Sequence, residues 1–345
     1  MRYQRPSVQQ RKHSESRLRP ISLDMTSENS STTATIPVIE IDQLTKDYDV
    51  GFWRKRKVRA LDGLSLTVNQ GEIFGFLGAN GAGKTTTLKL LMRLIFPSGG
   101  SARILGHDIA DVSMHSRIGY LPENPYFYDY LTALEFLNFC GQIFGFSKAA
   151  RDSRSKELLQ RVRLDESKWN TQLRKFSKGM LQRVGLAQAL VNNPEVVFLD
   201  EPMSGLDPIG RREVRDLIAS LRQEGKTVFM CSHILSDIEV LCDRVAILKG
   251  GRLAQVGYLD ELRQQVSGRN LVEVIVSGVG QAALESQLPA GDGFLVTSTP
   301  AGLRVELSDE KDVDRVLAAL RNAGGKLVSV QPLRQSLEEL FLNQE

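Results

Sequence analysis

The glycine-rich run Gly78-Ala-Asn-Gly-Ala-Gly-Lys84-Thr85 has the residue types and spacing with the clearest chemical meaning. It matches G-x-x-x-x-G-K-[ST] in full and stands between an apolar run and a helix-like stretch, as that pattern requires. Glycines let successive backbone N–H groups curl around phosphate oxygens, and a helix N-terminus adds positive potential. An accidental glycine-rich turn would give the four fixed positions in only about 1% of such chains. The run therefore predicts a nucleotide phosphate site.

Two residues of this run carry the predicted chemistry. Lys84 would reach the β- and γ-phosphates as a point charge, and Thr85 would offer its hydroxyl to Mg²⁺. The other predicted phosphate contacts in and after the run are Gly78, Asn80, Gly81, Ala82, Gly83 and Thr86.

A second run, Val196-Val-Phe-Leu-Asp200-Glu201, supplies the carboxylates that a bound metal ion needs. Its apolar residues place Asp200 at the exit of a buried strand, where the carboxylate would bind Mg²⁺ directly or through water. Glu201 would polarise the attacking water as general base. Taken alone, the run is better explained as an ordinary strand that ends in acidic residues. The phosphate loop upstream reverses that preference.

Hydrophobic patterning predicts the elements that position these residues. From Ile39 onward, strand-like and helix-like segments alternate, which is typical of an α/β sheet layered with helices. Residues 132–190 are mainly helix-like and predict a helical insert. From residue 271 the order becomes strand-helix-strand-strand-helix-strand, the ferredoxin-like arrangement, before a last short helix over 337–342. The predicted strands are 72–77, 195–200, 227–231, 244–248, 271–276, 294–298, 303–307 and 326–330, and the predicted helices include 84–94, 214–221, 281–288 and 313–320.

Composition and length exclude several classes of protein. A chain of 345 residues predicts about two domains, and 41% hydrophobic with 25% charged residues excludes wholesale disorder. The net charge of +3 is too near balance for a nucleic-acid binder. No apolar run has the length of a membrane-spanning helix, and the three scattered cysteines form neither a disulfide framework nor a zinc site. We therefore expect a soluble, intracellular protein.

A third motif resembles a known family. Residues 176–183, Phe-Ser-Lys-Gly-Met-Leu-Gln-Arg, look like a degenerate form of the LSGGQ signature of ATP-binding cassette (ABC) proteins. The resemblance covers about residues 38–269, with the family's elements in the family's order. The other matching positions are Tyr48 for the aromatic that stacks on adenine, Glu123 for the Q-loop, Ser204-Gly-Leu-Asp207 for the D-loop and His233 for the switch histidine.

The resemblance implies a fold and three parts of the chain. The fold would be an α/β P-loop (RecA-like) nucleotide-binding domain with antiparallel β and helical subdomains, plus the small C-terminal α+β (ferredoxin-like) domain. Independently of the resemblance, residues 1–37 are rich in Ser, Thr, Arg and Gln and lack apolar periodicity, which predicts disorder. A dispensable tail is favoured over a transit peptide, which stays open as the alternative. Residues 38–269 would be the ATP-binding domain, and residues 270–345 an accessory domain.

The resemblance also implies a mechanism with ATP and Mg²⁺ as cofactors. Two nucleotide-binding domains would meet head to tail, as a homodimer or with a paired subunit. Ser177 and Gly179 of one copy would contact the γ-phosphate held by Lys84 of the other, and Met180 and Asp207 would complete the site. His233 would stabilise developing charge and orient the water and Glu201. ATP turnover would drive separate transmembrane permease subunits, with this chain peripheral on the cytoplasmic face of the membrane and no nucleic acid involved.

Two departures from the family's commonest pattern matter. Glu123 replaces the usual glutamine and adds negative charge near the phosphates, although it can still coordinate Mg²⁺. Lys178 and Met180 replace glycine and glutamine in the signature but leave Ser177 and Gly179 intact. Both departures, and the ending Ser336-Leu-Glu-Glu-Leu-Phe-Leu342, resemble the export-type branch that handles drugs, lipids, polysaccharides or ions.

Alternatives remain open at this point. The main alternative is a soluble cassette ATPase of repair, translation or cluster assembly. By the family's pattern, translation types usually carry two cassettes and repair types carry large coiled-coil or zinc inserts, whereas this sequence shows one phosphate loop, one signature and no such insert. A purely regulatory ATP-binding module would not need the complete catalytic set. The basic run Arg54-Lys-Arg-Lys57 is better explained as a solvated loop than as a lipid-attracting patch. The aromatic residues of 126–130 are equally compatible with core packing and with contact to the membrane partner.

Overall fold

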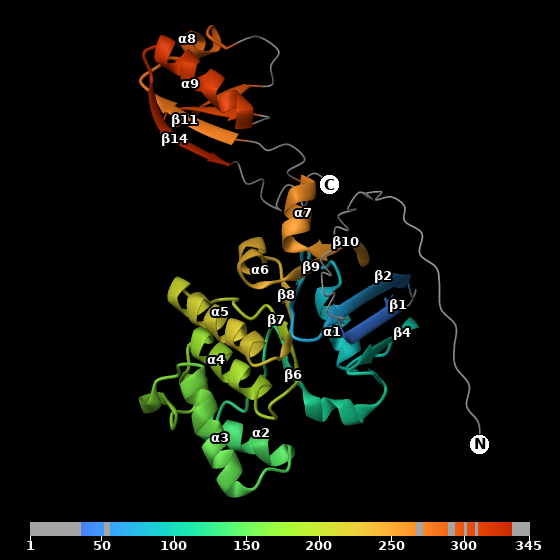
Figure 1. The fold of residues 1–345 in the computed structure, drawn as a ribbon. Coiled ribbons are helices and arrows are strands. Elements are labelled where there is room, and N and C mark those ends of the chain that lie inside the picture. The colour runs from blue at the N-terminus through green and yellow to red at the C-terminus, as the bar shows by residue number, and fades with distance from the viewer. Residues whose placement is uncertain are drawn as a thin grey trace, which may run out of the picture. The chain divides into compact units, whose positions relative to one another are not determined.

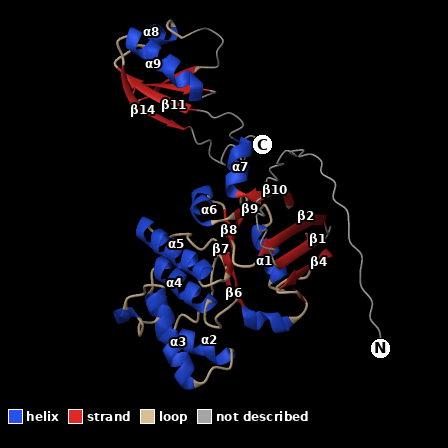
Figure 2. Cartoon of the chain, viewed as in Figure 1, coloured by secondary structure: helices blue, strands red, loops and turns tan. Residues whose placement is uncertain are grey.

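The computed structural model describes residues 36–51, 56–266, 272–288, 294–299, 302–307 and 310–332. All but the last two residues of the predicted 1–37 tail lie outside the described residues, as do part of the basic run and the predicted helix over 337–342. The remaining elements form a P-loop α/β domain with two subdomains and a C-terminal ferredoxin-like part, which confirms the predicted fold class (Figures 1 and 2). The exact boundaries at residues 37 and 269 stay predictions. Among the described residues, no helix has the length and apolar character to span a bilayer.

The central sheet has six strands in the order β10-β9-β3-β8-β7-β6. Five of them run parallel and β10 is antiparallel to β9. Every residue of β3, β7 and β8 is buried, as expected for parallel strands that are covered on both faces. The bounds are β3 Ile73–Leu77, β6 Ile118–Leu121, β7 Val196–Asp200, β8 Thr227–Ser232, β9 Arg244–Lys249 and β10 Arg252–Tyr258.

Two hydrophobic cores lie on opposite faces of this sheet. Side chains alternate along β3, so Phe74 and Phe76 enter one core while Ile73 and Leu77 enter the other. The phenylalanine core is shared with an antiparallel sheet of order β2-β1-β4-β5. The strands of that sheet are β1 Pro37–Val50, β2 Arg56–Asn69, β4 Gly99–Ile104 and β5 His107–Asp108.

Helices cover the sheet and build the predicted insert. Thr132 begins the insert with a capping box, in which its hydroxyl accepts a hydrogen bond from the Glu135 N–H at 3.2 Å and the Glu135 carboxylate accepts one from the Thr132 N–H at 2.8 Å. The insert comprises α2 Ala133–Ile143, α3 Lys148–Arg161, α4 Lys178–Ala189 and the short 3₁₀ turns Glu166–Lys168 and Leu173–Lys175. The other helices are α1 Lys84–Leu91, the 3₁₀ turn Val112–Arg117, α5 Pro208–Gln223, α6 Leu235–Leu241 and α7 Leu259–Val266.

The C-terminal part has its own sheet and its own core. Its four strands are antiparallel in the order β12-β13-β11-β14, and two helices pack on one face. Its buried residues, such as Val274, Val305 and Leu320, belong to neither core of the cassette. The elements are β11 Val272–Ser277, α8 Gln281–Glu285, β12 Leu295–Thr299, β13 Gly302–Leu307, a 3₁₀ turn Glu310–Asp312, α9 Val313–Asn322 and β14 Lys326–Pro332.

Candidate nucleotide-binding site

The phosphate loop joins the end of β3 to the start of α1. Its backbone enters the left-handed region at Gly81 (φ +83°) and Gly83 (φ +110°), where only glycine is unstrained. A Cβ atom at Gly83 would also lie 2.7 Å from the carbonyl oxygen of Ala60 in β2. The two glycines therefore give the loop its shape, as the sequence pattern predicts.

Lys84 folds back over this loop. Its Nζ donates hydrogen bonds to the carbonyl oxygens of Gly78 at 2.7 Å and Ala79 at 3.3 Å, and lies 3.8 Å from Oε1 of Glu201. The buried ammonium group is thus held at the floor of a cavity of about 270 Å³. The residues that line this cavity are Ala79, Asn80, Gly81, Gly83, Lys84, Thr85, Thr86, Glu123 and Glu201.

Asp200 is a fully buried carboxylate at the end of β7. Its Oδ2 accepts a hydrogen bond from the Thr85 hydroxyl at 2.9 Å, whereas its Oδ1 has no hydrogen-bond partner in the described part of the chain. Burial raises the pKa of Asp200 to about 6, and the charges of Glu123 and Glu201 add to that rise, while Thr85 and Lys84 oppose it. A cation beside Oδ1 would satisfy both the orphaned oxygen and the buried charge.

The donor set beside Asp200 fits Mg²⁺. Mg²⁺ favours oxygen ligands and is commonly held by one or two carboxylates together with substrate phosphates and water. The Thr85 hydroxyl, the Asp200 carboxylate and the cavity-lining Glu123 are all oxygen donors. Over the described ranges, no group of three or more His, Cys, Asp or Glu side chains could hold a metal ion unaided.

Glu201, which lines this cavity, forms a pair with His233. Nδ1 of His233 lies 2.9 Å from Oε1 of Glu201, and the Glu201 side chain is 8% exposed against 44% for His233. Glu201 has a left-handed backbone (φ +50°), and its N–H donates to the carbonyl oxygen of Cys231 at 3.0 Å. Strained backbone of this kind persists where its surroundings hold it, and it is common at functional sites. The pair thus presents a shielded carboxylate next to a solvent-accessible imidazole.

Comparisons with known proteins agree with this geometry. The family described as ABC transporter matches residues 61–204, and the family described as ATP-binding protein DrrA1-3-like, C-terminal domain, matches residues 257–344. An uncharacterized ABC transporter ATP-binding protein of Nostoc sp. is 46% identical over 91% of each chain. This chain belongs to the ATP-binding proteins of ABC transporters.

Two further relatives of this ABC transporter ATP-binding protein refine the picture. A daunorubicin resistance ATP-binding protein of Streptomyces coeruleorubidus is 34% identical over 83% of this chain and 90% of its own. A solved dimeric ATP-binding cassette in a post-hydrolysis state, bound to ADP and Pi, is 27% identical, with a TM-score of 0.60 over 64% of this chain and 98% of its own. The cassette described here is accordingly an ATPase that binds and hydrolyses ATP.

The ABC signature and D-loop residues do not line the cavity of their own cassette. The Ser177 hydroxyl accepts a hydrogen bond from the Met180 N–H at 3.3 Å and caps α4, and Oδ1 of Asp207 accepts one from the Gly210 N–H at 3.0 Å and caps α5. Gly179 lies beside Leu206. Roles for Ser177, Gly179, Met180 and Asp207 in a site shared with a second copy stay predictions, since one chain alone does not test them.

Tyr48, the predicted adenine-stacking residue, also lies outside the residues that line the cavity. It belongs to β1, and Nζ of Lys46 sits 5.1 Å from the centroid of its ring. The same ammonium group donates a hydrogen bond to the carbonyl oxygen of Phe96 at 2.7 Å. The stacking role stays a prediction as well.

Gln182 is a residue of the site to which we assign no separate role from sequence. Its buried Nε2 donates hydrogen bonds to the carbonyl oxygens of Pro202 at 3.0 Å and Glu201 at 3.4 Å. The amide thereby ties α4, the helix that follows the signature serine, to the backbone of the predicted catalytic glutamate. Its sequence signal is a polar residue three and four positions before Gly185 and Leu186, which places it on the same buried side of α4.

Proposed function

We propose that this chain powers export through separate transmembrane permease subunits. It would act at the cytoplasmic face of the cell membrane, as a homodimer or with a paired nucleotide-binding subunit. The observation that carries the proposal is one cavity of an ABC cassette that is lined by Lys84, Thr85 and Glu201. Asp200 joins this set through the Thr85 hydroxyl, and His233 joins it through the Glu201 carboxylate. The relative named for daunorubicin resistance supports export, and the solved dimeric relative supports pairing of two cassettes.

In the proposed reaction, each residue has one task. Thr85 and Asp200, together with Glu123, would hold Mg²⁺, which would neutralise charge on the phosphates. Lys84 exchanges its loop carbonyl partners for phosphate oxygens. Glu201 takes the proton of the attacking water, and His233 keeps the Glu201 carboxylate in place and hydrogen-bonds the γ-phosphate.

The signature segment would close the site of the other copy. A serine that caps a helix presents a hydroxyl, backbone donors and the positive end of the helix dipole to an anion. Ser177 and Gly179 lie away from their own cavity, so a second chain is needed to bring them to the γ-phosphate. Nucleotide binding and dimer closure are then one event, and hydrolysis releases it.

The proposed permease surface lies on and beside the helical insert. Tyr126, Tyr128 and Tyr130 are all exposed, Tyr126 at 86%, and the Tyr128 ring meets the exposed Phe139 ring edge-on at 5.7 Å. Phe127 turns the other way and packs on Phe136, with ring centroids 5.2 Å apart. Of the two uses considered for residues 126–130, core packing thus suits Phe127 and partner contact suits the tyrosines.

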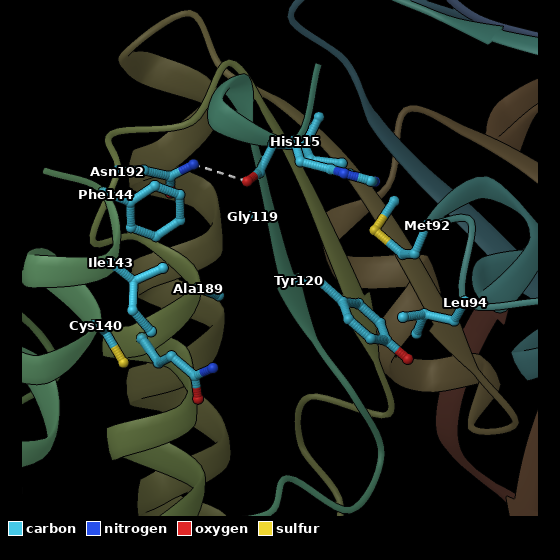
Figure 3. Close-up of a pocket in the computed structure, with 12 residues that line it drawn as sticks. Met92, Leu94, His115, Gly119, Tyr120, Cys140, Ile143, Phe144, Ala189 and Asn192 are labelled. Atoms are coloured by element: carbon cyan, nitrogen blue, oxygen red, sulfur yellow. Dashed lines mark hydrogen bonds between the residues drawn. The ribbon is translucent and has the colours of Figure 1, made fainter. Parts of the chain in front are cut away.

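An apolar pocket of about 400 Å³ adjoins the same insert (Figure 3). Ile143 and Phe144 at the end of α2 form one wall, while Leu94 and Tyr120 lie on the other side of the space. Leu94, Ile143 and Phe144 are strongly exposed for residues of their size. An exposed apolar pocket of this kind suits an apolar side chain of a partner, and we assign it to a helix of the permease.

A glutamine in place of Glu201 tests the proposal. Glu201→Gln should keep ATP affinity, lower turnover by at least about a hundredfold because the general base is lost, and accumulate an ATP-held dimer in size-exclusion chromatography. Lys84→Ala is the matched control, which should lose ATP affinity and therefore show no dimer. Co-purification of a multi-span membrane protein encoded by a neighbouring gene should accompany the wild-type chain. Unchanged hydrolysis in Glu201→Gln would reject the assigned role.

A further inference from the structure

A chain of backbone contacts connects the phosphate loop to β2 through the turn between β9 and β10. The Gly251 N–H donates a hydrogen bond to the Ala82 carbonyl oxygen at 2.9 Å, and the Asp62 N–H donates to the Gly251 carbonyl oxygen at 2.8 Å. The turn is therefore held between the phosphate loop on one side and β2 on the other.

The spacing of these three segments leaves no room for a side chain. A Cβ atom at Gly251 would lie 2.9 Å from the carbonyl oxygen of Ala60, and one at Gly83 would lie 2.7 Å from the same oxygen. Both glycines also have left-handed backbones, with φ of +82° and +110°. The distance between the phosphate loop and β2 is thus set by direct contact between their backbone atoms and those of the intervening turn.

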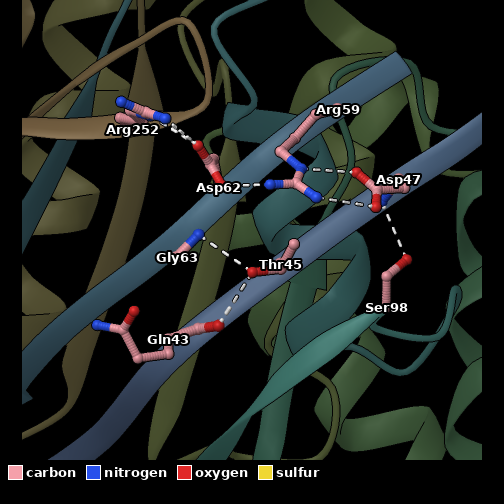
Figure 4. A network of polar contacts seen from close by, with 8 residues as sticks. All are labelled: Gln43, Thr45, Asp47, Arg59, Asp62, Gly63, Ser98 and Arg252. Carbon is pink, nitrogen blue, oxygen red and sulfur yellow. Dashed lines mark hydrogen bonds and ion pairs between the residues drawn. The ribbon is translucent and has the colours of Figure 1, made fainter. Parts of the chain in front are cut away.

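Asp62 connects this backbone assembly to a side-chain network (Figure 4). Its Oδ1 accepts a hydrogen bond from Nη1 of Arg59 at 2.9 Å, and its Oδ2 accepts one from Nε of Arg252 at 2.7 Å. Arg59 also donates two hydrogen bonds to Asp47 of β1, from Nε to Oδ1 at 2.8 Å and from Nη2 to Oδ2 at 3.3 Å. We call Asp47, Arg59, Asp62 and Arg252 the Asp62 network. Arg252 and Arg59 lower the pKa of Asp62, so it is charged at neutral pH.

The Asp62 network ends one residue before Tyr48. Asp47 and Tyr48 pair with Arg59 and Val58 of β2, and the Asp47 N–H also donates to the Ser98 hydroxyl at 3.0 Å. Successive side chains of a strand point to opposite faces, so the carboxylate of Asp47 and the ring of Tyr48 leave β1 on opposite sides. The network therefore fixes the backbone from which the ring projects without touching the ring.

We propose that Asp62 is a positioning residue, which sets the spacing between the phosphate loop and Tyr48 and so matches the site to a triphosphate that carries adenine. The inference rests on the predicted stacking of adenine on Tyr48 within the proposed ATP-binding function. Asp62 is suited to this task because it makes two connections. Its backbone N–H binds the β9–β10 turn, which binds the phosphate loop, and its carboxylate binds Arg59, which binds Asp47 of β1. Neutralising the Asp62 carboxylate would weaken its contact with Arg59 and leave the hydrogen bond from the Asp62 N–H to Gly251 intact.

The test compares ATP with inorganic tripolyphosphate, which has the charge but lacks the base. In the full-length chain with Mg²⁺, Asp62→Asn should raise the Kd and KM for ATP about fivefold, the order expected when one charged connection of a network is lost. The Kd for tripolyphosphate and the kcat for ATP should stay within about twofold. Arg59→Gln should act in the same direction, and the double variant should be no worse than the stronger single variant because both break the same connection.

Matched controls separate this inference from simpler explanations. Glu195→Gln breaks a two-pronged pair with Arg117, of 2.6 and 2.7 Å, and should leave all four quantities unchanged. Tyr48→Leu should weaken ATP but not tripolyphosphate. If Tyr48→Leu does so and Asp62→Asn and Arg59→Gln do not, Asp62 has no positioning role. If Tyr48→Leu has no effect, the stacking role itself is wrong. Equal weakening of both ligands in Asp62→Asn would assign Asp62 to the phosphate loop or to folding, and would overturn the inference.

Discussion

At the scale of single residues, the charged Asp200 carboxylate destabilises the folded chain when no ligand is bound. Asp200 is a fully buried carboxylate near the negative charges of Glu123 and Glu201, and one of its oxygens has no hydrogen-bond partner among the described residues. Such a carboxylate is unfavourable in a chain without ligand. The Thr85 hydroxyl and the Lys84 ammonium group offset only part of that cost. The raised pKa of Asp200 reflects the part of this free-energy cost that stays uncompensated. Binding of ATP with its metal ion would lower that cost.

This cost gives a pH-dependent prediction for Asp200→Asn in nucleotide-free, Mg²⁺-free protein. The pKa of Asp200 is about 6 in the folded chain against an ordinary 3.8, so the folded state binds the proton more tightly. The stabilisation of the folded chain by this bound proton is complete below the ordinary pKa and is lost as the pH rises through about 6. Asp200→Asn should therefore raise the free energy of unfolding by about 1–2 kcal/mol at pH 7.5, and by less at pH 4.5.

Urea unfolding at the two pH values measures this difference. Thr85→Val is a useful companion, because it removes the hydroxyl that donates to Asp200 and should lower the stability of the same chain. An equal gain for Asp200→Asn at both pH values would mean that packing, and not the buried charge, is responsible.

At the scale of elements, β6 and α4 are packed in contact without an intervening side chain. A Cβ atom at Gly119 of β6 would lie 1.9 Å from the carbonyl oxygen of Ala189, the last residue of α4. Asn192, just beyond α4, donates hydrogen bonds to the carbonyl oxygens of Ser116 and Ile118 on either side of the start of β6. The helix that begins at the signature is thereby fixed to the central sheet at its far end.

Gly119→Ala tests this contact. The added methyl group must move either the strand or the end of α4, so the free energy of unfolding should fall by about 1–3 kcal/mol. Gly99→Ala in β4 is the control, because its Cβ would meet only Thr45 at 3.8 Å, an ordinary contact. Chemical denaturation of both variants gives the comparison, and equal losses would count against a special role for the β6–α4 contact.

Sequence reasoning succeeded where the information is local. The phosphate run predicts its own loop because its glycines occupy left-handed positions, and the apolar runs predict β3, β7 and β8 within a residue or two. It could not predict contacts that depend on the folded chain. The pair of Asp62 with Arg252 joins residues 190 positions apart. The amide of Gln182 meets its carbonyl partner at Pro202 only after α4 and the segment that follows β7 have come together in the folded chain.

On the scale of the whole chain, the described residues of the accessory part and of the cassette form separate hydrophobic cores. Leu259 and Leu262 of α7 belong to the core of the cassette, whereas the buried residues from Val272 onward form a core of their own. The proposed division near residue 269 falls between these two sets. The cassette should therefore keep most of its free energy of unfolding when the C-terminal residues are removed.

Removal of residues 270–345 tests that division. The shortened chain should unfold cooperatively, and its Kd for ATP should stay within about twofold, because the lining of the cavity comes from residues 79–201. Isothermal calorimetry and thermal unfolding measure the two properties. A truncated chain that no longer folds would move the boundary of the cassette beyond residue 269, while altered self-association with normal affinity would assign the accessory part to dimer regulation.

The alternation of side chains along β3 has a consequence for how this polypeptide can change over evolutionary time. Inserting or deleting one residue there would exchange the occupants of the two cores, because Phe74 and Phe76 would swap faces with Ile73 and Leu77. The same event would displace the start of α1, and with it the ammonium group that meets the nucleotide. Length variation in descendants of this gene should therefore accumulate in turns such as the one at Gly145, where no neighbour crowds the backbone, and be absent from the span between Ile73 and Lys84.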